Sequence, residues 1–276
     1  MDKLNFLTAG IPLKSIPRTY KTAFTDLKNM GLNGIEIEFV RGVNISESNI
    51  KEVQELAAPN EMVLTAHAPF FVNLNSPEQD KIDASIARII ETARMAKTLG
   101  LYSIVFHAAY YMGMTEEDTY KKVQDGFSKI MQVVYDENIE VFVRPETTGK
   151  ATQWGDLDEV IRISKEYEQV LPCIDFSHLY ARTIGQNNTY DDFSRILETI
   201  GKELGDYALK NFHAHIAGIE FTPKGEKKHL NLTESQFNFQ DLLKAMKAFD
   251  IKGVVVCESP SIEDDAKILA DYYKSL

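Results

Sequence analysis

The feature that most constrains the fold is a regular alternation of short β-branched runs with longer amphipathic stretches along all 276 residues. Eight runs have the pattern of buried strands, and they begin about 35 residues apart, the length of a strand plus a crossover helix. They are residues 4–10, 33–39, 62–67, 102–107, 139–145, 170–175, 208–215 and 252–258. Eight such units predict an α/β fold, a single (β/α)8 barrel of the TIM type, with one domain over residues 1–276.

An open, doubly wound sheet is the alternative fold for alternating strands and helices. That fold usually carries a glycine-rich phosphate loop after its first strand. Here the equivalent stretch, TAGIPLKS at 8–15, lacks the GxGxxG pattern. The barrel is therefore the preferred interpretation.

Composition limits the cellular locations and the binding partners that we expect for the protein. The N-terminal MDKLNFLTAG has no signal-peptide features, and no apolar run reaches the length of a membrane span. Cys173 and Cys257 both lie in apolar runs and form no CxxC pair. We therefore expect a cytoplasmic protein with no membrane contact. The formal net charge of −11 disfavours nonspecific binding to phosphate backbones unless a local patch or bound cations reverse the sign.

Histidines and acids gather at the carboxyl ends of the predicted strands, and in a closed parallel barrel these ends meet at one mouth. In chain order the residues are His67, His107, Glu146, Asp175, His178, His213, His215 and Glu258, while His229 lies in a predicted loop. His213 and His215 are two apart, so strand alternation points both to the same side.

Each of these residues alone has a structural explanation. A single histidine after a strand is more often hydrogen-bonded than metal-bound, and Asp175 could cap a helix. Independent structural residues, however, have no reason to select the same end of six strands. Clustered carboxylates without cations would also repel one another. The pattern therefore predicts a metal centre with zinc, or manganese as second choice. Glu36 and Glu38 are assigned to hydrogen bonding at the mouth.

Several motifs in a fixed order carry a family resemblance that covers nearly the whole chain. They are HAPFFVNL, IVFHAA, RPETTGK, CIDFSH, NFHAHIAGIE, KKHLNL and CESP. With them the chain resembles endonuclease IV, the metal-dependent apurinic/apyrimidinic endonucleases built on a (β/α)8 barrel.

The resemblance implies two to three zinc ions per chain, with manganese possible. It places the first zinc on His67 and His107 and a second on Asp175, His213 and Glu258. Glu146 would bridge the two as the catalytic carboxylate, and His178 and His229 would hold a third. A metal-bound hydroxide would cleave the phosphodiester 5′ to an abasic site in damaged double-stranded DNA, for base excision repair. The protein is expected to act as a monomer.

The chain departs from the family at the third site. The usual aspartate two residues before the histidine is Lys227 here. His215 could complete the site from its strand, or Glu226 could turn inward if the loop shifts its register. Phe70 stands where the family often has a tyrosine wedged into DNA. Together with Lys227 and Lys228 it is expected to contact DNA.

Two other functions stay open. Sugar isomerases and epimerases of the xylose-isomerase-like barrels use one metal on a glutamate, aspartate, histidine, glutamate set. Glu146, Asp175, His213 and Glu258 resemble that set. A protein that binds damaged DNA without cutting it is the other possibility. Incision of an abasic oligonucleotide distinguishes all three functions.

Overall fold

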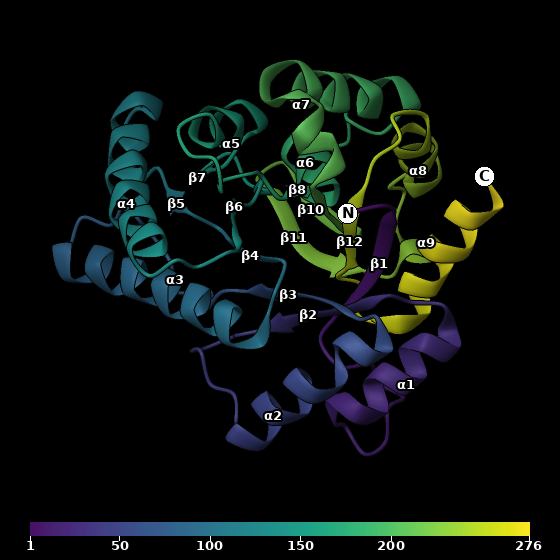
Figure 1. Cartoon of the computed structure of the whole chain (residues 1–276). Helices are drawn as coiled ribbons and strands as arrows, with labels where there is room; N and C mark the ends of the chain where they lie inside the picture. Colours follow the sequence, from purple (N-terminus) through teal and green to yellow (C-terminus); the bar gives the residue numbers. More distant parts are fainter.

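The computed structural model describes residues 1–276, and at its centre is a parallel eight-stranded sheet that curls around on itself (Figure 1). The strand order is β6-β4-β3-β2-β1-β12-β9-β8. The strands are β1 (Leu4–Ala9), β2 (Gly34–Glu38), β3 (Val63–His67), β4 (Ser103–Phe106), β6 (Phe142–Pro145), β8 (Ile174–Asp175), β9 (Phe212–Ile216) and β12 (Gly253–Cys257). Neighbours in the ring are consecutive units of the chain, except that β1 of the first unit pairs with β12 of the last.

The seam between β6 and β8 is closed by two isolated parallel bridges. Val143 pairs with Val170, and Glu146 pairs with Cys173. The backbone N–H of Thr147 donates to the carbonyl of Cys173 at 3.0 Å. The carboxyl ends of all eight strands therefore meet at one mouth, and the predicted (β/α)8 barrel is confirmed.

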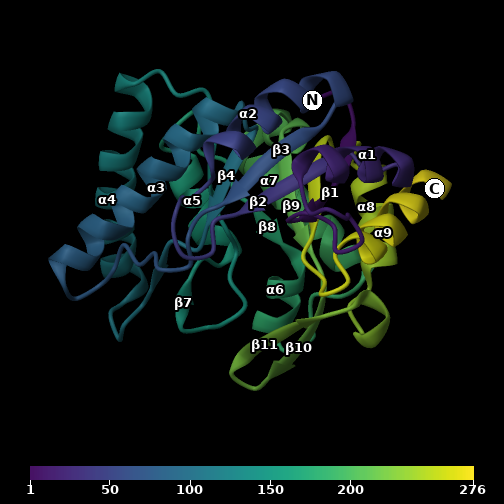
Figure 2. The same ribbon diagram turned by 90° about the horizontal axis from the view of Figure 1, so that it is seen from below.

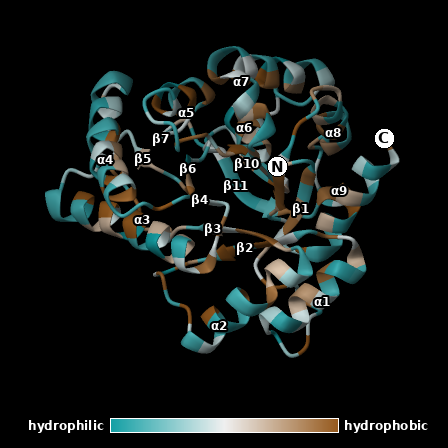
Figure 3. Cartoon of the chain, viewed as in Figure 1, coloured by the Kyte–Doolittle hydropathy of each residue, from teal (hydrophilic) through white to brown (hydrophobic).

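Helices cover the outside of the sheet and turn their apolar faces towards it (Figure 3). They are α1 (Tyr20–Met30), α2 (Glu47–Leu56), α3 (Gln79–Leu99), α4 (Glu116–Asp136), α5 (Leu157–Ser164), α6 (Phe176–Arg182), α7 (Tyr190–Lys210), α8 (Phe239–Ala248) and α9 (Glu263–Ser275). In α3, Ile86, Ile89 and Ala93 are buried at helical spacing, and Gly100 ends the helix in the left-handed conformation. None of the helices has both the length and the apolar character that crossing a bilayer requires.

Two antiparallel ribbons extend the barrel at its mouth. One joins β5 (Ala109–Tyr110) to β7 (Gln153–Trp154), and the other joins β10 (Gly218–Thr222) to β11 (Gly225–Leu230). Figure 2 shows the β10–β11 ribbon projecting beyond the strands, next to α6. The ring of Phe221 on β10 packs edge-on against Tyr180 of α6. The prediction that His229 lies in a loop is therefore corrected, because His229 is part of β11.

Three predicted strands begin later than expected. In the sixth unit Pro172 has no N–H to donate, and only Ile174–Asp175 forms a regular strand. In the fifth, the strand begins at Phe142. In the seventh, Ala208 and Leu209 belong to the last turn of α7, whose inner face they bury. A short apolar run has the same composition in a buried helix end as in a strand, so periodicity could not separate them.

Alternation along the strands sends every second side chain into the barrel, and the upper part of this interior is polar. Glu36, Thr65, Ser103, His213 and His215 are all buried there. The main hydrophobic core lies between the sheet and the helices. The fold thus collects polar side chains inside the ring and directs them towards the mouth.

Candidate metal centre

Three groups of ligand-type side chains lie at the mouth, and they share two carboxylates. Within each group the ligand atoms lie within 4.8 Å of one another. The first group is His67, His107 and Glu146; the second is Glu146, Asp175, His215 and Glu258; the third is Asp175, His178 and His229. Of the ligands predicted from the sequence, only His213 is absent from these three groups, and it forms a separate group with Cys173 and His215. Glu226, the alternative named for the third site, is in none of these groups.

In the first group, two imidazoles face one carboxylate oxygen. His67 is the last residue of β3, and its Nε2 lies 3.2 Å from Oε2 of Glu146. His107 follows β4, and its Nε2 lies 2.9 Å from the same oxygen. Nδ1 of His67 is 2.8 Å from the carbonyl of Ala68. Because a carbonyl only accepts, Nδ1 is the donor, and Nε2 is left as the metal-binding nitrogen.

In the second group, Glu146 offers its other oxygen. Oε1 of Glu146 lies 3.2 Å from Nδ1 of His215, and Oε1 of Glu258 lies 3.4 Å from the same nitrogen. Asp175 ends β8 and stands opposite His215 in the β8–β9 ladder. Glu146 thus faces the first group with one oxygen and the second with the other, the arrangement of a bridging ligand.

The structure places His213 apart from the second group and favours His215 there. This histidine is one inward-facing position deeper in the barrel than His215, and its Nδ1 lies 2.8 Å from Oγ of Ser103. Its Nε2 lies 3.2 Å from Oε2 of Glu36. Strand alternation predicts that both histidines point to the same side, but it does not predict their depth in the barrel. The pairing of Asp175 with His215 determines that depth. His215 therefore stands where His213 was expected.

Burial and charge oppose each other throughout the centre. Burial would raise the pKa of Glu146, but the positive charges of His107 and His215 outweigh it and hold that pKa well below its usual range. Burial raises the pKa of Asp175 to about 6. Burial would lower the pKa of His67, but the hydrogen bond and the negative charge of Glu146 outweigh it and raise that pKa to about 10. Without cations, protons on the imidazoles thus balance the carboxylates.

The donor set fits divalent metal ions. Nε2 of His229 and Oδ2 of Asp175 are buried and have no hydrogen-bond partner, which is costly unless another group completes them. Imidazole nitrogen and carboxylate oxygen are the ligands of zinc and also suit manganese.

Glu36 on β2 contributes more than the sequence suggested. Oε1 of Glu36 lies 2.9 Å from Nε2 of His215, on the side of the ring away from Glu146. Its Oε2 accepts a hydrogen bond of 2.7 Å from Oγ1 of Thr65. A carboxylate behind a ligand histidine orients the ring and raises its basicity. The only sequence signal for this role is the alternation of acids in GIEIE.

Above the centre, the surface is hollow. A cavity of about 200 Å³ is lined by Phe70, Tyr110, Lys150 and Glu226, together with the histidines of the first group. A groove of about 980 Å³ beside it shares Lys150 and Glu226 and also includes Lys224. Phe70 at this rim is largely exposed, and so is its neighbour Phe71, which the sequence prediction omitted.

The two lysines predicted to contact DNA are less free than expected. Nζ of Lys227 lies 2.6 Å from Oε1 of Glu220, and Nζ of Lys228 lies 3.6 Å from Oε2 of the same acid. One carboxylate therefore partly neutralises both. Lys150, which lines the cavity and the groove, is the cation best placed at the mouth.

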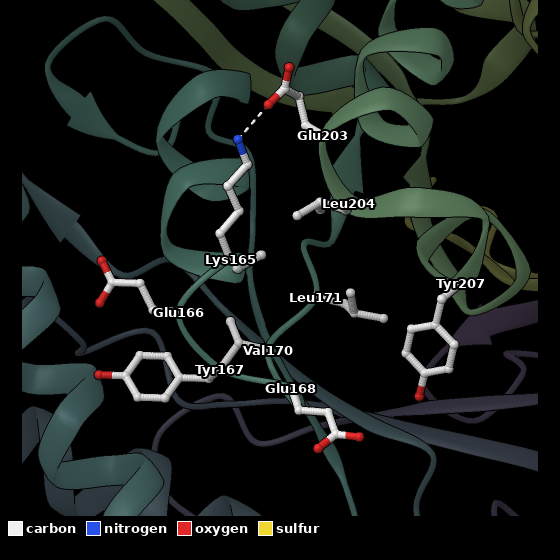
Figure 4. Close-up of a pocket in the computed structure, with 10 residues that line it drawn as sticks. Lys165, Glu166, Tyr167, Glu168, Val170, Leu171, Glu203, Leu204 and Tyr207 are labelled. Carbon is white, nitrogen blue, oxygen red and sulfur yellow. Dashed lines mark hydrogen bonds and ion pairs between the residues drawn. The ribbon is translucent and has the colours of Figure 1, made fainter.

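A further cavity, of about 470 Å³, lies at the opposite end of the barrel (Figure 4). Its lining includes Glu166 and Glu168 from the segment that leads into β8, and Tyr207 from the end of α7. Lys165 and Glu203 form an ion pair across it. Its lining contains no histidine or cysteine, and none of its residues belongs to a group of ligand-type side chains.

The chain is similar in sequence to several known proteins. The chain is 43% identical over 273 residues to an uncharacterized protein of Methanocaldococcus jannaschii, covering 99% of this chain and 98% of that protein. It is 25% identical over 229 residues to a probable endonuclease 4 of Aquifex aeolicus, covering 80% and 77%.

Solved structures show the same fold. Endonuclease IV from Thermus thermophilus superposes with a TM-score of 0.74 at 15% identity, covering 99% of this chain and 100% of that one. A D-tagatose 3-epimerase-like protein superposes with a TM-score of 0.72 at 18% identity, covering 98% and 97%. Residues 24–276 match the family described as xylose isomerase-like TIM barrels. With its closed barrel and its ligand groups at the mouth, the chain belongs to the xylose isomerase-like TIM barrel family and resembles its endonuclease IV members.

Proposed function

We propose that the protein is a metal-dependent apurinic/apyrimidinic endonuclease that cleaves the DNA phosphodiester 5′ to an abasic site. The observation that carries this proposal is the set of three ligand groups joined through Glu146 and Asp175. Multi-metal centres of this kind serve phosphodiester hydrolysis, because the ions act together on the attacking and the leaving oxygen. The sequence similarity to a probable endonuclease 4 supports the same reaction.

A sugar isomerase or epimerase is the competing function, and the second group alone would be enough for it. Glu146, Asp175, His215 and Glu258 form a complete four-ligand set for one ion. The histidines of the other two groups would then have no shared purpose, although each is positioned within ligand distance of a carboxylate. The endonuclease accounts for all three groups, which is why we favour it.

Different residues of the chain would bind the ions, the bases and the phosphate. Bound ions would supply Lewis-acid chemistry and neutralise charge on a phosphate. Glu146 would hold two of them at a fixed separation through its two oxygens. Phe70 and Phe71 offer exposed aromatic surface that can stack on bases next to the missing one. Lys150 stands where it can meet a backbone phosphate, so the local charge opposes the net charge of −11.

The test is incision of a duplex oligonucleotide that contains one abasic-site analogue. We expect zinc-loaded protein to cut 5′ to the lesion and chelator-treated protein not to cut. Glu146→Gln should lose more than about a hundredfold in activity, because outer-sphere changes alone cost up to about that much and Glu146 is a direct ligand. Glu168→Gln makes the same chemical change at the exposed opposite end and should keep full activity.

Other outcomes would each contradict the proposal in a different way. Full activity of Glu146→Gln would exclude the bridging role. Interconversion of ketohexoses without incision of the oligonucleotide would establish the isomerase. Tight binding of abasic DNA by metal-loaded protein, with no cleavage product, would establish a lesion-binding protein.

A further inference from the structure

The β10–β11 ribbon has one irregularity, and it lies beside the third ligand group. The pairing shifts its register between Glu220 and Phe221. The cross-strand pairs are Ile219 with His229, Glu220 with Lys228, and Phe221 with Glu226. Lys227 is therefore an extra residue of β11 without a partner on β10, which defines a β-bulge.

The bulge exchanges the residues that face inward. In a regular strand, residues two apart share a face, so Lys227 would lie beside His229 and Glu226 would point away. With one extra residue inserted, Glu226 shares the face of His229 instead. The side chains agree: Lys227 meets Glu220 at 2.6 Å on the outer face, and Oε2 of Glu226 lies 3.6 Å from Nε2 of His178.

The orientation of the His178 ring selects this carboxylate. Nδ1 of His178 lies 2.9 Å from the carbonyl of Thr147, which only accepts, so Nδ1 carries the hydrogen. The lone pair is then on Nε2, the nitrogen that faces Glu226. Asp175 is within reach of both the second and the third group. Its Oδ2 lies 3.3 Å from Nδ1 of His178, away from Nε2, so we assign Asp175 to the ion of the second group. Of the two acids, Glu226 faces the metal-binding nitrogen.

Close contacts with Gly149 fix the position of Glu226 on one side. Its backbone N–H donates to the carbonyl of Gly149 at 2.9 Å. A Cβ on Gly149 would come within 2.6 Å of the Cβ of Glu226 and within 2.8 Å of Oε2. Nε2 of His229 is buried without a partner, and the His229 ring lies 5.6 Å from that of His178. Glu226 thus lies beside His178, and His229 with its partnerless nitrogen is on the same face of β11 as Glu226.

We propose that Glu226, brought inward by the bulge at Lys227, is the third protein ligand of a divalent metal site with His178 and His229. It takes the place of the aspartate that the resemblance leads one to expect at position 227. Three protein ligands are the usual minimum for zinc, so the site is complete without Lys227. This inference rests on the metal centre of the proposed function, but not on cleavage of DNA.

The experiment counts metal ions by elemental analysis after zinc loading and desalting. Wild-type protein should retain about three ions per chain and Glu226→Gln about two, since a neutral amide is a poor zinc ligand. Gly149→Ala should lose the same ion by displacing Glu226. Lys227→Gln is the matched control one residue away, and it should retain about three ions because its side chain is on the outer face.

Deletion of Lys227 gives a second, sharper test. All three cross-strand pairs can persist in the shortened strand, and Glu226 then stands two residues before the histidine on a regular inner face. This variant should therefore keep the third ion. If it fails to fold, the three substitutions decide alone.

Unchanged retention of the third ion by Glu226→Gln would overturn the inference, as would its loss in Lys227→Gln. Wild-type protein with only two ions would also overturn it, while leaving a two-metal endonuclease possible. Conversely, three ions with one lost in Glu226→Gln, but no incision of abasic DNA, would support the site and overturn the proposed function.

Discussion

The mouth of the barrel and the layer directly below it are built from the same residue types. They differ in the partners that their buried polar atoms find within the protein. In the lower layer, Oγ1 of Thr65 donates to Glu36, and Oγ of Ser103 lies 2.8 Å from Nδ1 of His213. At the mouth, Oδ2 of Asp175 and Nε2 of His229 are buried without partners. Nε2 of His213 and Oε1 of Glu36 in the lower layer also lack hydrogen bonds, but they lie 3.2 Å from a carboxylate oxygen and 2.9 Å from an imidazole nitrogen, respectively. Nε2 of His229 at the mouth has no such contact, so the mouth is the layer that fits added ions.

His213 and His215 show what this difference means for one side chain. Burial lowers the pKa of His213 to about 4, so the ring is neutral and suited to an interior position. Burial acts on His215 too, but its contacts with the Cys173 thiol and with the carboxylates of Glu258, Glu36 and Glu146 hold the pKa of His215 well above its usual range. The two residues are equally buried on one strand and differ because His215 faces more acids than His213 does. The following predictions test that difference.

The largest effect on metal content and activity is expected when His215, rather than His213, is replaced by alanine. His215→Ala removes a ligand, so we expect the loss of one metal ion and of more than about a hundredfold in activity. His213→Ala should keep every ion and instead lower the free energy of unfolding by about 1–3 kcal/mol, because buried partners lose their hydrogen bonds. Elemental analysis and denaturant titration measure the two effects. Equal metal loss in both variants would abolish the distinction between layers.

An intermediate effect is expected at the contact between the layers. Glu36→Gln removes the charge 2.9 Å behind Nε2 of His215. We expect the dissociation constant for the ion at His215 to rise about 10–100-fold, while the number of ions at saturation stays the same. Competition with a chromophoric chelator measures it. An unchanged dissociation constant would show that the lower layer does not act on the upper one.

The smallest effect is a dependence of metal binding on pH. Because Glu146 outweighs burial and raises the pKa of His67 to about 10, this imidazole carries a proton at neutral pH in metal-free protein. A ligand histidine must be neutral, so zinc binding should release protons, and affinity should increase as the pH rises towards that pKa. Titration calorimetry in two buffers of different ionisation enthalpy counts the protons. Binding without proton release at pH 7 would contradict this account.

The sequence was enough to predict the barrel and the position of its centre. Eight strand runs at even spacing implied a closed ring, and ligand-type residues at the ends of those runs implied one shared mouth. His67, His107, Glu146, Asp175 and Glu258 could be placed in this way because a strand end is a local feature, and closure of the ring brings all such ends together.

Depth, register and strand pairing were decided only by the tertiary structure. Alternation could not choose between His213 and His215, since both point inward and only the pairing with Asp175 sets their height. A bulge is a property of two paired strands, so the inward turn of Glu226 depended on β10 as much as on β11. The sequence therefore determined which residues reach the mouth, and the pairing of distant segments determined which of them meet.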